Sequence, residues 1–314
     1  MELLNRRSFV RLAGAAYITN AIRPAPAQST SSVRSRGSFP IRLGATTWVG
    51  KGQTPDSAVK RIRDLGLSTC QIGFNALTAD AAEPLKYALT NYGVEATALM
   101  ELGPGRKVWN LSEGPQTIGI IPLATQRARI DALKLAADIA SQCGIPSIHT
   151  HCGFIPEDPN DSVYPQAVAA VKEIAGHCKE RGRSFLCETG QETPITLLRM
   201  IDDVGLDNVF VNLDLANLIL YGKGNPVDAM DVIGNRVRGI HAKDGLFPTD
   251  PWGLGKEVAI GEGKVDFPVV LKKLKQVNYQ GAMTIEREIQ GEQQKKDILQ
   301  SKIFLEALIA KTYS

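Results

Sequence analysis

The feature that most constrains the fold is an alternation that begins at Ile41, in which short apolar runs rich in β-branched residues alternate with longer amphipathic stretches. This pattern is typical of repeated βα units around a parallel sheet. The predicted strands are residues 41–48, 69–74, 95–101, 146–152, 184–188, 209–214, 237–244 and 282–286. The helical stretches with the clearest spacing are residues 54–67, 125–145, 164–182, 195–205 and 295–313. Eight strands over about 270 residues predict an α/β fold, a single (β/α)₈ barrel spanning residues 41–314.

An open, doubly wound sheet is the main alternative fold. It would need a glycine-rich phosphate turn after its first strand, and "TTWVGKGQ" lacks the GxGxxG pattern. Two long connections, 102–123 and 245–265, follow predicted strand ends and each contains a tryptophan. In a barrel such connections lie over the carboxyl ends of the strands, where active sites are found.

The N-terminus has a different character from the rest of the chain. Arg6 and Arg7 precede a short, weakly apolar run, and Ala25 and Ala27 supply the small-residue pattern of a cleavage site. This order resembles a twin-arginine export signal. We therefore expect a signal peptide over residues 1–27, a flexible linker over 28–40, and a periplasmic protein with no stable membrane span after cleavage, since the apolar run is shorter than a bilayer span. Retention of the run as an anchor remains an alternative.

The charge balance gives no indication of a nucleic-acid partner. Residues 1–27 hold four arginines and one glutamate, a net charge of +3 that equals the net charge of the whole chain. The chain that remains after cleavage is close to neutral and has no general basic field. Five cysteines without CxxC spacing argue against a disulfide framework.

Four predicted strands in succession end in a residue that can bind a metal or move a proton. These residues are Glu188, Asp214, His241 and Glu286, on the fifth to eighth strands. Equivalent ends of adjacent parallel strands meet at one mouth of a barrel, so the four side chains should converge there. Three carboxylates and one imidazole suit one divalent ion, Mn²⁺ or Mg²⁺ in the first place, with Co²⁺ or Zn²⁺ as alternatives.

From Ile41 to its end, the chain resembles the xylose isomerase-like TIM barrel superfamily, and within it the sugar phosphate isomerase/epimerase branch of ketose 3-epimerases and inosose dehydratases. The likeness lies in "ETGQET", "NLDLANLILYGKGNP", "IHAKD", "GLGKEVAIGEGKVDF" and "YQGAMTIERE". It implies that Glu188, Asp214, His241 and Glu286 bind the metal. It also implies that Glu188 and Glu286 exchange a proton with the substrate carbon through an enediolate. Two carboxylates on opposite faces of one carbon give epimerisation, and return of the proton to the neighbouring carbon gives isomerisation.

One position departs from the epimerase pattern. Those enzymes commonly carry a histidine three residues after the aspartate of the sixth strand, and this chain has Asn217. An amide can hydrogen-bond a hydroxyl but does not exchange protons near neutral pH. The substrate and the reaction are therefore less constrained than the metal site.

Further candidates for substrate binding lie near the predicted mouth. His149 and His151 alternate along the fourth strand, and we expect them to face opposite ways, with His151 toward the mouth. The other candidates are Asn217, Lys243, Gln191, Trp109 and Trp252. His177 lies on a predicted helix and is interpreted as structural.

Several functions remain open at this point. A lyase or dehydratase acting on keto-sugars or 3-keto-glycosides would use the same metal and carboxylates as an epimerase. A non-catalytic sugar-binding protein would leave the carboxylates without a chemical role. A base-excision endonuclease is disfavoured because it needs many histidines and a basic face, and this chain has four histidines. A small sugar or sugar derivative is the expected partner, and the sequence leaves a homo-oligomer open.

Overall fold

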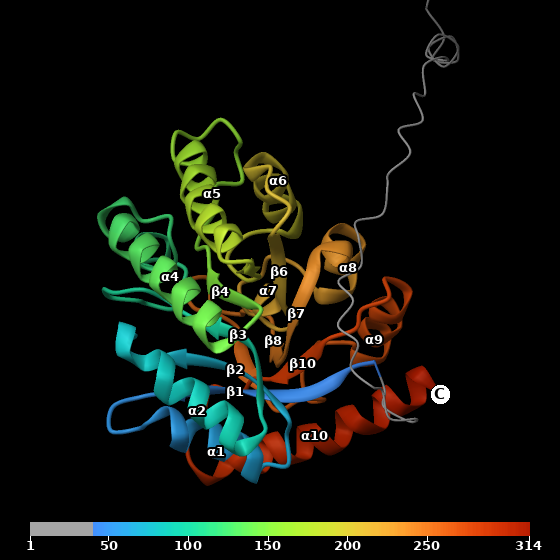
Figure 1. Ribbon diagram of the computed structural model, residues 1–314. Coiled ribbons are helices and arrows are strands. Elements are labelled where there is room, and N and C mark those ends of the chain that lie inside the picture. The colour runs from blue at the N-terminus through green and yellow to red at the C-terminus, as the bar shows by residue number, and fades with distance from the viewer. Residues whose placement is uncertain (1–39) are drawn as a thin grey trace, which may run out of the picture. The chain divides into compact units, whose positions relative to one another are not determined.

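The computed structural model describes residues 40–314, which form one closed barrel of eight parallel strands (Figure 1). Around the barrel the strands follow the order β1, β10, β7, β6, β5, β4, β3, β2. Their bounds are β1 Arg42–Val49, β2 Thr69–Phe74, β3 Glu95–Met100, β4 Ser147–His151, β5 Ser184–Glu188, β6 Val209–Asp214, β7 Val237–Ala242 and β10 Ala282–Ile285. Each lies within two residues of its predicted range, and the (β/α)₈ fold is confirmed.

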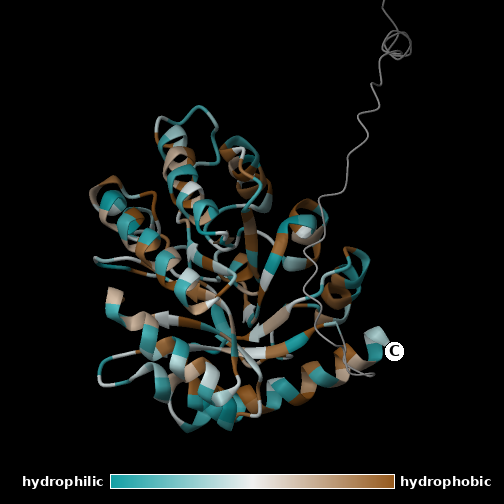
Figure 2. Cartoon of the chain, in the orientation of Figure 1, coloured by the Kyte–Doolittle hydropathy of each residue, from teal (hydrophilic) through white to brown (hydrophobic). Residues whose placement is uncertain are grey.

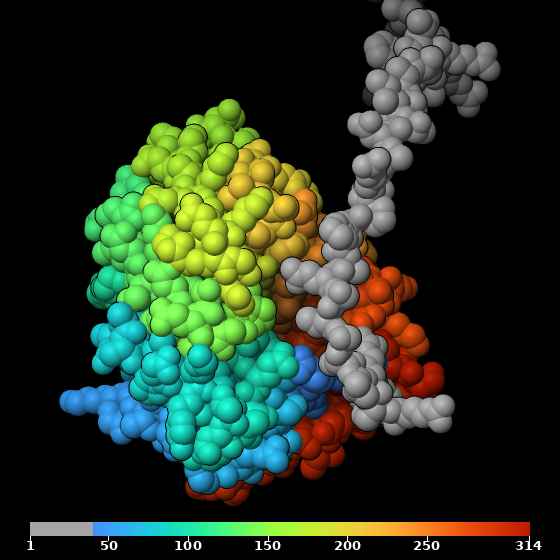
Figure 3. Space-filling view, in the orientation of Figure 1, coloured from blue at the N-terminus to red at the C-terminus, as the bar shows by residue number. Residues whose placement is uncertain are grey.

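Within residues 40–314, eight helices surround the strands. They are α1 Pro55–Asp64, α2 Ala82–Tyr92, α4 Leu123–Cys143, α5 Tyr164–Glu180, α6 Pro194–Val204, α8 Pro226–Ile233, α9 Phe267–Gln276 and α10 Glu292–Tyr313. Shorter helical turns are η1 Ala79–Ala81, α3 Gly114–Thr117, α7 Asn217–Leu220 and η2 Gly234–Arg236. Apolar residues gather along the strands and on parts of the helices (Figure 2), and helices and loops make up most of the face seen in Figure 3.

Local sequence explains where the helices begin and end. Thr54 and Ser57 form a reciprocal capping box at the start of α1, and Pro55 takes the first helical position. Gly144 and Gly205 follow α4 and α6 with φ of 73° and 68°. A residue with a β-carbon would be strained in this left-handed conformation, so glycine ends both helices.

A buried arginine holds the 102–123 connection in place. Arg129 on α4 is fully buried, and its guanidinium donates hydrogen bonds to the backbone carbonyls of Pro104, Arg106, Thr117 and Gly119. Four carbonyl dipoles thus replace the water that the charge loses on burial. This bonding fixes both sides of the segment that carries Trp109.

The 245–265 connection contains a small antiparallel hairpin of β8 (Asp244–Leu246) and β9 (Lys256–Val258). The prediction of one continuous strand over 237–244 is wrong. The barrel strand β7 ends at Ala242, Lys243 belongs to neither strand, and β8 of the hairpin begins at Asp244. The Asp244 carboxylate accepts hydrogen bonds from the backbone N–H groups of Gly245, Gly261, Gly263 and Val265. One side chain therefore ties residues 261–265 to the start of the connection.

The expected export signal and nearly all of the expected linker lie outside the described residues. Among residues 40–314, none of the helices combines the length and the apolarity that crossing a bilayer requires. All five cysteines are free thiols, and four of them are buried.

Candidate metal and proton-transfer site

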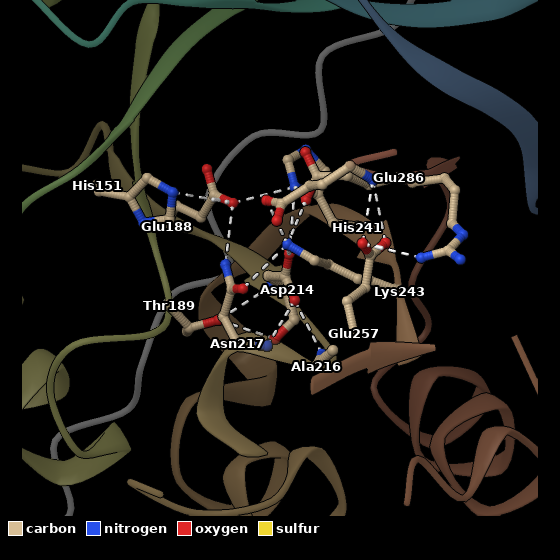
Figure 4. A network of polar contacts seen from close by, with 12 residues as sticks. His151, Glu188, Thr189, Asp214, Ala216, Asn217, His241, Lys243, Glu257 and Glu286 are labelled. Carbon is tan, nitrogen blue, oxygen red and sulfur yellow. Dashed lines mark hydrogen bonds and ion pairs between the residues drawn. The ribbon is translucent and has the colours of Figure 1, made fainter. Parts of the chain in front are cut away.

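Three carboxylates from three different strand ends converge on one histidine nitrogen (Figure 4). His241 Nδ1 lies 3.1 Å from Glu188 Oε1, 3.5 Å from Asp214 Oδ2 and 3.3 Å from Glu286 Oε2. Glu188 and Asp214 end β5 and β6, His241 is the penultimate residue of β7, and Glu286 follows β10. The barrel therefore brings together the four residues that were predicted to converge.

The Asp214 carboxylate has one oxygen bonded and one oxygen free. Its Oδ1 accepts hydrogen bonds from the backbone N–H groups of Ala216 (2.8 Å) and Asn217 (2.7 Å). These bonds hold the turn that leads into α7 and fix the carboxylate's orientation. Its Oδ2 has no hydrogen-bond partner in the described chain although Asp214 is fully buried.

The side-chain amide of Gln71, inside the barrel, orients the His241 ring. His241 Nε2 lies 2.7 Å from Gln71 Oε1, and since that oxygen can only accept, Nε2 carries the proton. Gln71 is held in turn, because its Nε2 donates to Asn212 Oδ1 at 3.0 Å. Nδ1 is therefore the nitrogen that faces the carboxylates, and it would offer its lone pair to a cation bound there, as in histidines that bind metals.

These four residues fit a divalent cation. Each offers one ligand atom, and all four atoms lie within 4.8 Å of one another. Asp214 Oδ2 is buried without a hydrogen-bond partner in the described chain, which is unfavourable unless a cation satisfies it. A second group of possible ligands, His149, Glu188 and His241, overlaps the first.

Burial and nearby charges shift the pKa values of the three carboxyls in different directions. Burial opposes the charge on Glu188, but His151 and His241 outweigh it and hold the pKa of that carboxyl well below its usual range. Burial likewise opposes the charge on Glu286, and Lys243 and His241 lower the pKa of that carboxyl. Burial raises the pKa of Asp214 to about 6 despite the nearby Lys243. Glu188 and Glu286 are therefore the two carboxylates held as anions.

Lys243 compensates this negative charge from one side. Its Nζ donates to Glu288 Oε1 (2.6 Å), Glu286 Oε2 (3.2 Å) and Asn217 Oδ1 (3.2 Å), and the side chain is 1% exposed. Burial opposes its charge, but Glu286 and Glu288 keep the pKa of Lys243 well above its usual range. The neighbouring carboxylate of Asp244 bonds to backbone N–H groups and does not pair with Lys243.

The prediction that His149 and His151 face opposite ways is wrong. His149 Nδ1 lies 3.0 Å from Glu188 Oε2, and His151 Nε2 lies 3.6 Å from Glu188 Oε1. Residues two apart on a strand point to the same face, and both rings point to the mouth for that reason. His149 is therefore a site residue that the sequence interpretation missed.

A chamber of about 310 Å³ lies over this cluster. His149, His151, Glu188, His241 and Glu286 line its floor together with Asn217. Trp109 forms part of its wall and contacts the His151 ring edge to face, with centroids 5.0 Å apart.

Other predicted substrate contacts lie farther from the chamber. Gln191 lies behind His151, with its Nε2 3.3 Å from His151 Nδ1, and does not line the chamber. Trp252 is 73% exposed and does not line it either. His177 contacts Asp138 on the helical layer, away from the site.

Other residues of the site were not singled out from the sequence, among them Glu288, Trp48 and Gln71. Trp48, near the end of β1, lines the chamber, and Gln71, in β2, orients His241. Both lie on predicted strands, and an aromatic ring or an amide within a strand looks like ordinary core. A polar Gln71 amid the apolar run "TCQIGF" was the one available signal.

Comparison with known proteins agrees with this fold and geometry. A family model described as xylose isomerase-like TIM barrel matches residues 59–308. This chain belongs to that family. Its fold is the barrel whose strand ends hold Glu188, Asp214, His241 and Glu286.

Solved structures of xylose isomerase-like proteins superpose over nearly the whole barrel. A xylose isomerase domain protein from Planctomyces limnophilus is 31% identical with a TM-score of 0.79, covering 86% of this chain and 99% of that one. A D-tagatose 3-epimerase-like protein is 18% identical with a TM-score of 0.68, covering 86% and 98%. A xylose isomerase-like TIM barrel protein from Mycobacterium smegmatis in complex with magnesium is 15% identical with a TM-score of 0.65, covering 88% and 98%. At such identities the last two show the fold alone.

The curated relatives are matched over a smaller share of their length. The chain spans 62% and 45% of two uncharacterised proteins that are each 25% identical over the matched part.

Proposed function

We propose that this protein is a divalent-metal-dependent sugar isomerase or epimerase in which Glu188 and Glu286 form the acid/base pair. The observation that carries the proposal is the convergence of Glu188, Asp214 and Glu286 on His241 Nδ1. Ketose 3-epimerases among the solved structures of the same fold support a sugar substrate, and the donor set supports a divalent cation.

The two glutamates are suited to proton transfer. Both are held as anions, so either can begin as the base. Their oxygens approach His241 Nδ1 from two different strands, β5 and the end of β10. A substrate carbon between them would lose its proton to the carboxylate on one face. The glutamate on the opposite face, after taking up a proton from solvent, would return that proton to the carbon. A cation held by Glu188, Asp214, His241 and Glu286 would supply the positive charge that acidifies a C–H group beside a carbonyl.

The remaining chamber residues suit a polyhydroxylated substrate. His151, Asn217 and Glu288 offer hydrogen-bonding groups, and Trp48 and Trp109 offer flat apolar surfaces for the C–H face of a sugar ring. Lys243 holds the Glu286 carboxylate and the Asn217 amide in place from behind. Asn217 lies where a protonatable histidine is common in ketose 3-epimerases, so we infer that any further proton transfer to substrate oxygens does not use this position.

The reaction class is tested by product analysis in D₂O. The metal-loaded protein is incubated with ketoses, inososes and 3-keto-glycosides, and the products are analysed by NMR. We expect the substrate's formula to be conserved, with deuterium at one carbon. Loss of water or of an aglycone would identify a lyase at the same site. Metal-independent binding without exchange for any of these compounds would instead identify a sugar-binding protein.

A further inference from the structure

A groove of about 810 Å³ adjoins the chamber on its β1 and β10 side. One wall is α1 with the loop before it, and the other is the segment from Glu286 to Lys295. The groove and the chamber share Trp48, Glu286 and Glu288 in their walls. The groove therefore begins beside the proposed acid/base residue Glu286, and its volume is larger than that of the chamber.

The groove is lined by groups that hydrogen-bond. Gln53, Ser57 and Arg61 lie on one side, and Gln290 and Gln294 lie on the other. The lining is mainly polar, since it also includes the charged side chains of Lys60, Asp64, Glu292 and Lys295. A polar lining is suited to a polyhydroxylated ring rather than to an apolar peptide or a lipid.

Arg61 is the most informative of these residues. It is half-buried, and in the described chain its guanidinium makes one hydrogen bond, from Nη2 to Gln294 Oε1 at 2.6 Å. A guanidinium has five N–H donors, so others remain available along the groove. Burial without a paired carboxylate lowers the pKa of Arg61, which gives this side chain a reason to accept a polar ligand.

Trp48 stands where the two spaces meet. Its partly exposed ring lies over Gly73, where an added β-carbon would come within 2.6 Å of the ring carbons. Gly73 therefore leaves room for the ring to lie flat against β2. A tryptophan in the wall of both cavities can contact two joined rings at once.

We propose that the groove binds the second ring of a glycoside whose first ring reacts in the chamber, so that the substrate class is a keto-sugar carrying a further sugar. This inference rests on the proposed function for the reacting ring. The second ring would extend past Glu288 and Trp48, with Arg61 and the glutamine side chains as hydrogen-bond partners.

The test compares fructose with ketose-containing disaccharides, isomaltulose and maltulose, in two assays. One assay measures Kd by calorimetry, and the other measures deuterium incorporation from D₂O as kcat/KM. Arg61→Ala removes a groove donor, and Arg63→Ala on the exposed side of the same helix is its control. Gln290→Trp obstructs the groove, and Gln300→Trp on the exposed face of α10 is its control.

We expect the disaccharides to bind more tightly than fructose. The ratio of disaccharide to fructose affinity should fall about tenfold in Arg61→Ala, the effect of losing one charged hydrogen bond. It should fall at least about tenfold in Gln290→Trp, because the added indole occupies the space of the second ring. It should not change in Arg63→Ala or Gln300→Trp.

Equal affinity for fructose and both disaccharides would overturn the inference, and so would an advantage that survives in Gln290→Trp. The proposed function is judged separately by deuterium. Exchange without a disaccharide advantage leaves the proposed function standing and removes this inference. If the disaccharides bind more tightly through the groove but no deuterium is exchanged, the groove binds a second sugar ring and the proposed isomerase or epimerase function is wrong.

Discussion

At the scale of single residues, the positive charge of Lys243 offsets the cost of burying the neighbouring carboxylates. Lys243 Nζ lies within 4 Å of Asp214, Glu286 and Glu288. Without a cation, this ammonium and His241 are the positive groups that face the buried carboxylates. A bound divalent ion would share that task, so the stability of Lys243 variants should depend on metal.

Lys243→Met is expected to destabilise the metal-free protein by about 3–5 kcal/mol, the effect of removing one partner of a buried ion pair. Saturating Mn²⁺ should recover part of that loss because it replaces the missing charge. Thermal denaturation with chelator and with Mn²⁺ measures both effects. Lys272→Met on the exposed surface of α9 is the control. A loss of the same size with and without Mn²⁺ would contradict this account.

Glu192 gives a separate prediction on pH. Burial raises the pKa of this carboxyl to about 8 from its ordinary 4.5. In the unfolded chain it loses its proton first, so its ionisation favours unfolding between about pH 4.5 and 8, and stability falls as the pH rises through this range. Glu192→Gln keeps the shape of the neutral acid and removes that titration.

We expect Glu192→Gln to melt roughly 10 °C above wild type at pH 8, because a pKa raised from 4.5 to about 8 corresponds to roughly 4 kcal/mol of stability lost by wild type at that pH. The two proteins should melt alike near pH 4.5. Melting temperatures across this pH range provide the measurement. A variant less stable than wild type at pH 8 would show that the buried carboxylate is charged and bonded.

Individual site residues could be predicted from the sequence where their position on a strand was decisive. Glu188, Asp214, His241 and Glu286 each stood at the end of an apolar run, and the barrel brings such ends together. Gln71 could not be predicted in the same way, because its contact with His241 joins strands β2 and β7 across the barrel interior. His149 was missed because the period of two along a strand was misapplied.

At the scale of elements, the hairpin of β8 and β9 braces the segment that carries Glu286. Glu257 on β9 accepts hydrogen bonds from the backbone N–H of Glu288, and it pairs with Arg287 at 2.9 Å. Asp244 fixes the other end of the same connection through four backbone N–H groups. The connection therefore acts as a support for the β10 end of the site.

Asp244→Ala is expected to loosen residues 259–265 and to lower activity at least tenfold, because the backbone groups that bond the carboxylate lose their acceptor. Hydrogen exchange of that segment measures the loosening directly. Asp266→Ala removes the N-cap of α9, a bond to the backbone N–H of Val269, and serves as the control. It should cost about 1 kcal/mol without raising exchange in 259–265. Unchanged exchange in Asp244→Ala would refute the bracing role.

Prediction of the elements succeeded where periodicity was strong. The strands were found to within two residues because each is a short apolar run between polar stretches. Helices α2, α8 and α9 were not singled out from the sequence, although α1 and α6, which are equally short, were. The hairpin was missed because its three-residue strands are set by long-range contacts of Asp244 rather than by local alternation.

At the scale of the whole molecule, closure of the barrel creates the site. β1 pairs with β10, which places Trp48 beside Glu286 although the two residues are far apart in sequence. The four proposed ligands come from consecutive positions around the barrel, β5, β6, β7 and β10. A cation bound by all four would link half of the barrel strands.

Metal should therefore stabilise the entire fold. At a concentration of 100 times its Kd, a cation that binds the folded state alone adds about 2.7 kcal/mol, which corresponds to a melting temperature about 5–10 °C higher. Calorimetric scans with Mn²⁺, with Mg²⁺ and with chelator measure this shift. Asp214→Asn should reduce it. An unchanged melting temperature at millimolar metal would show that the cluster does not hold a cation.

The most direct test of the central claim is deuterium incorporation into substrate by the metal-loaded wild type, Glu188→Gln and Glu286→Gln. Each substitution keeps the size of the side chain and removes the group that accepts the proton. We predict that both variants lose at least about 100-fold in exchange rate, within the range that general acid/base groups contribute. Full exchange in either variant, with metal bound, would contradict the assignment of Glu188 and Glu286 as the acid/base pair.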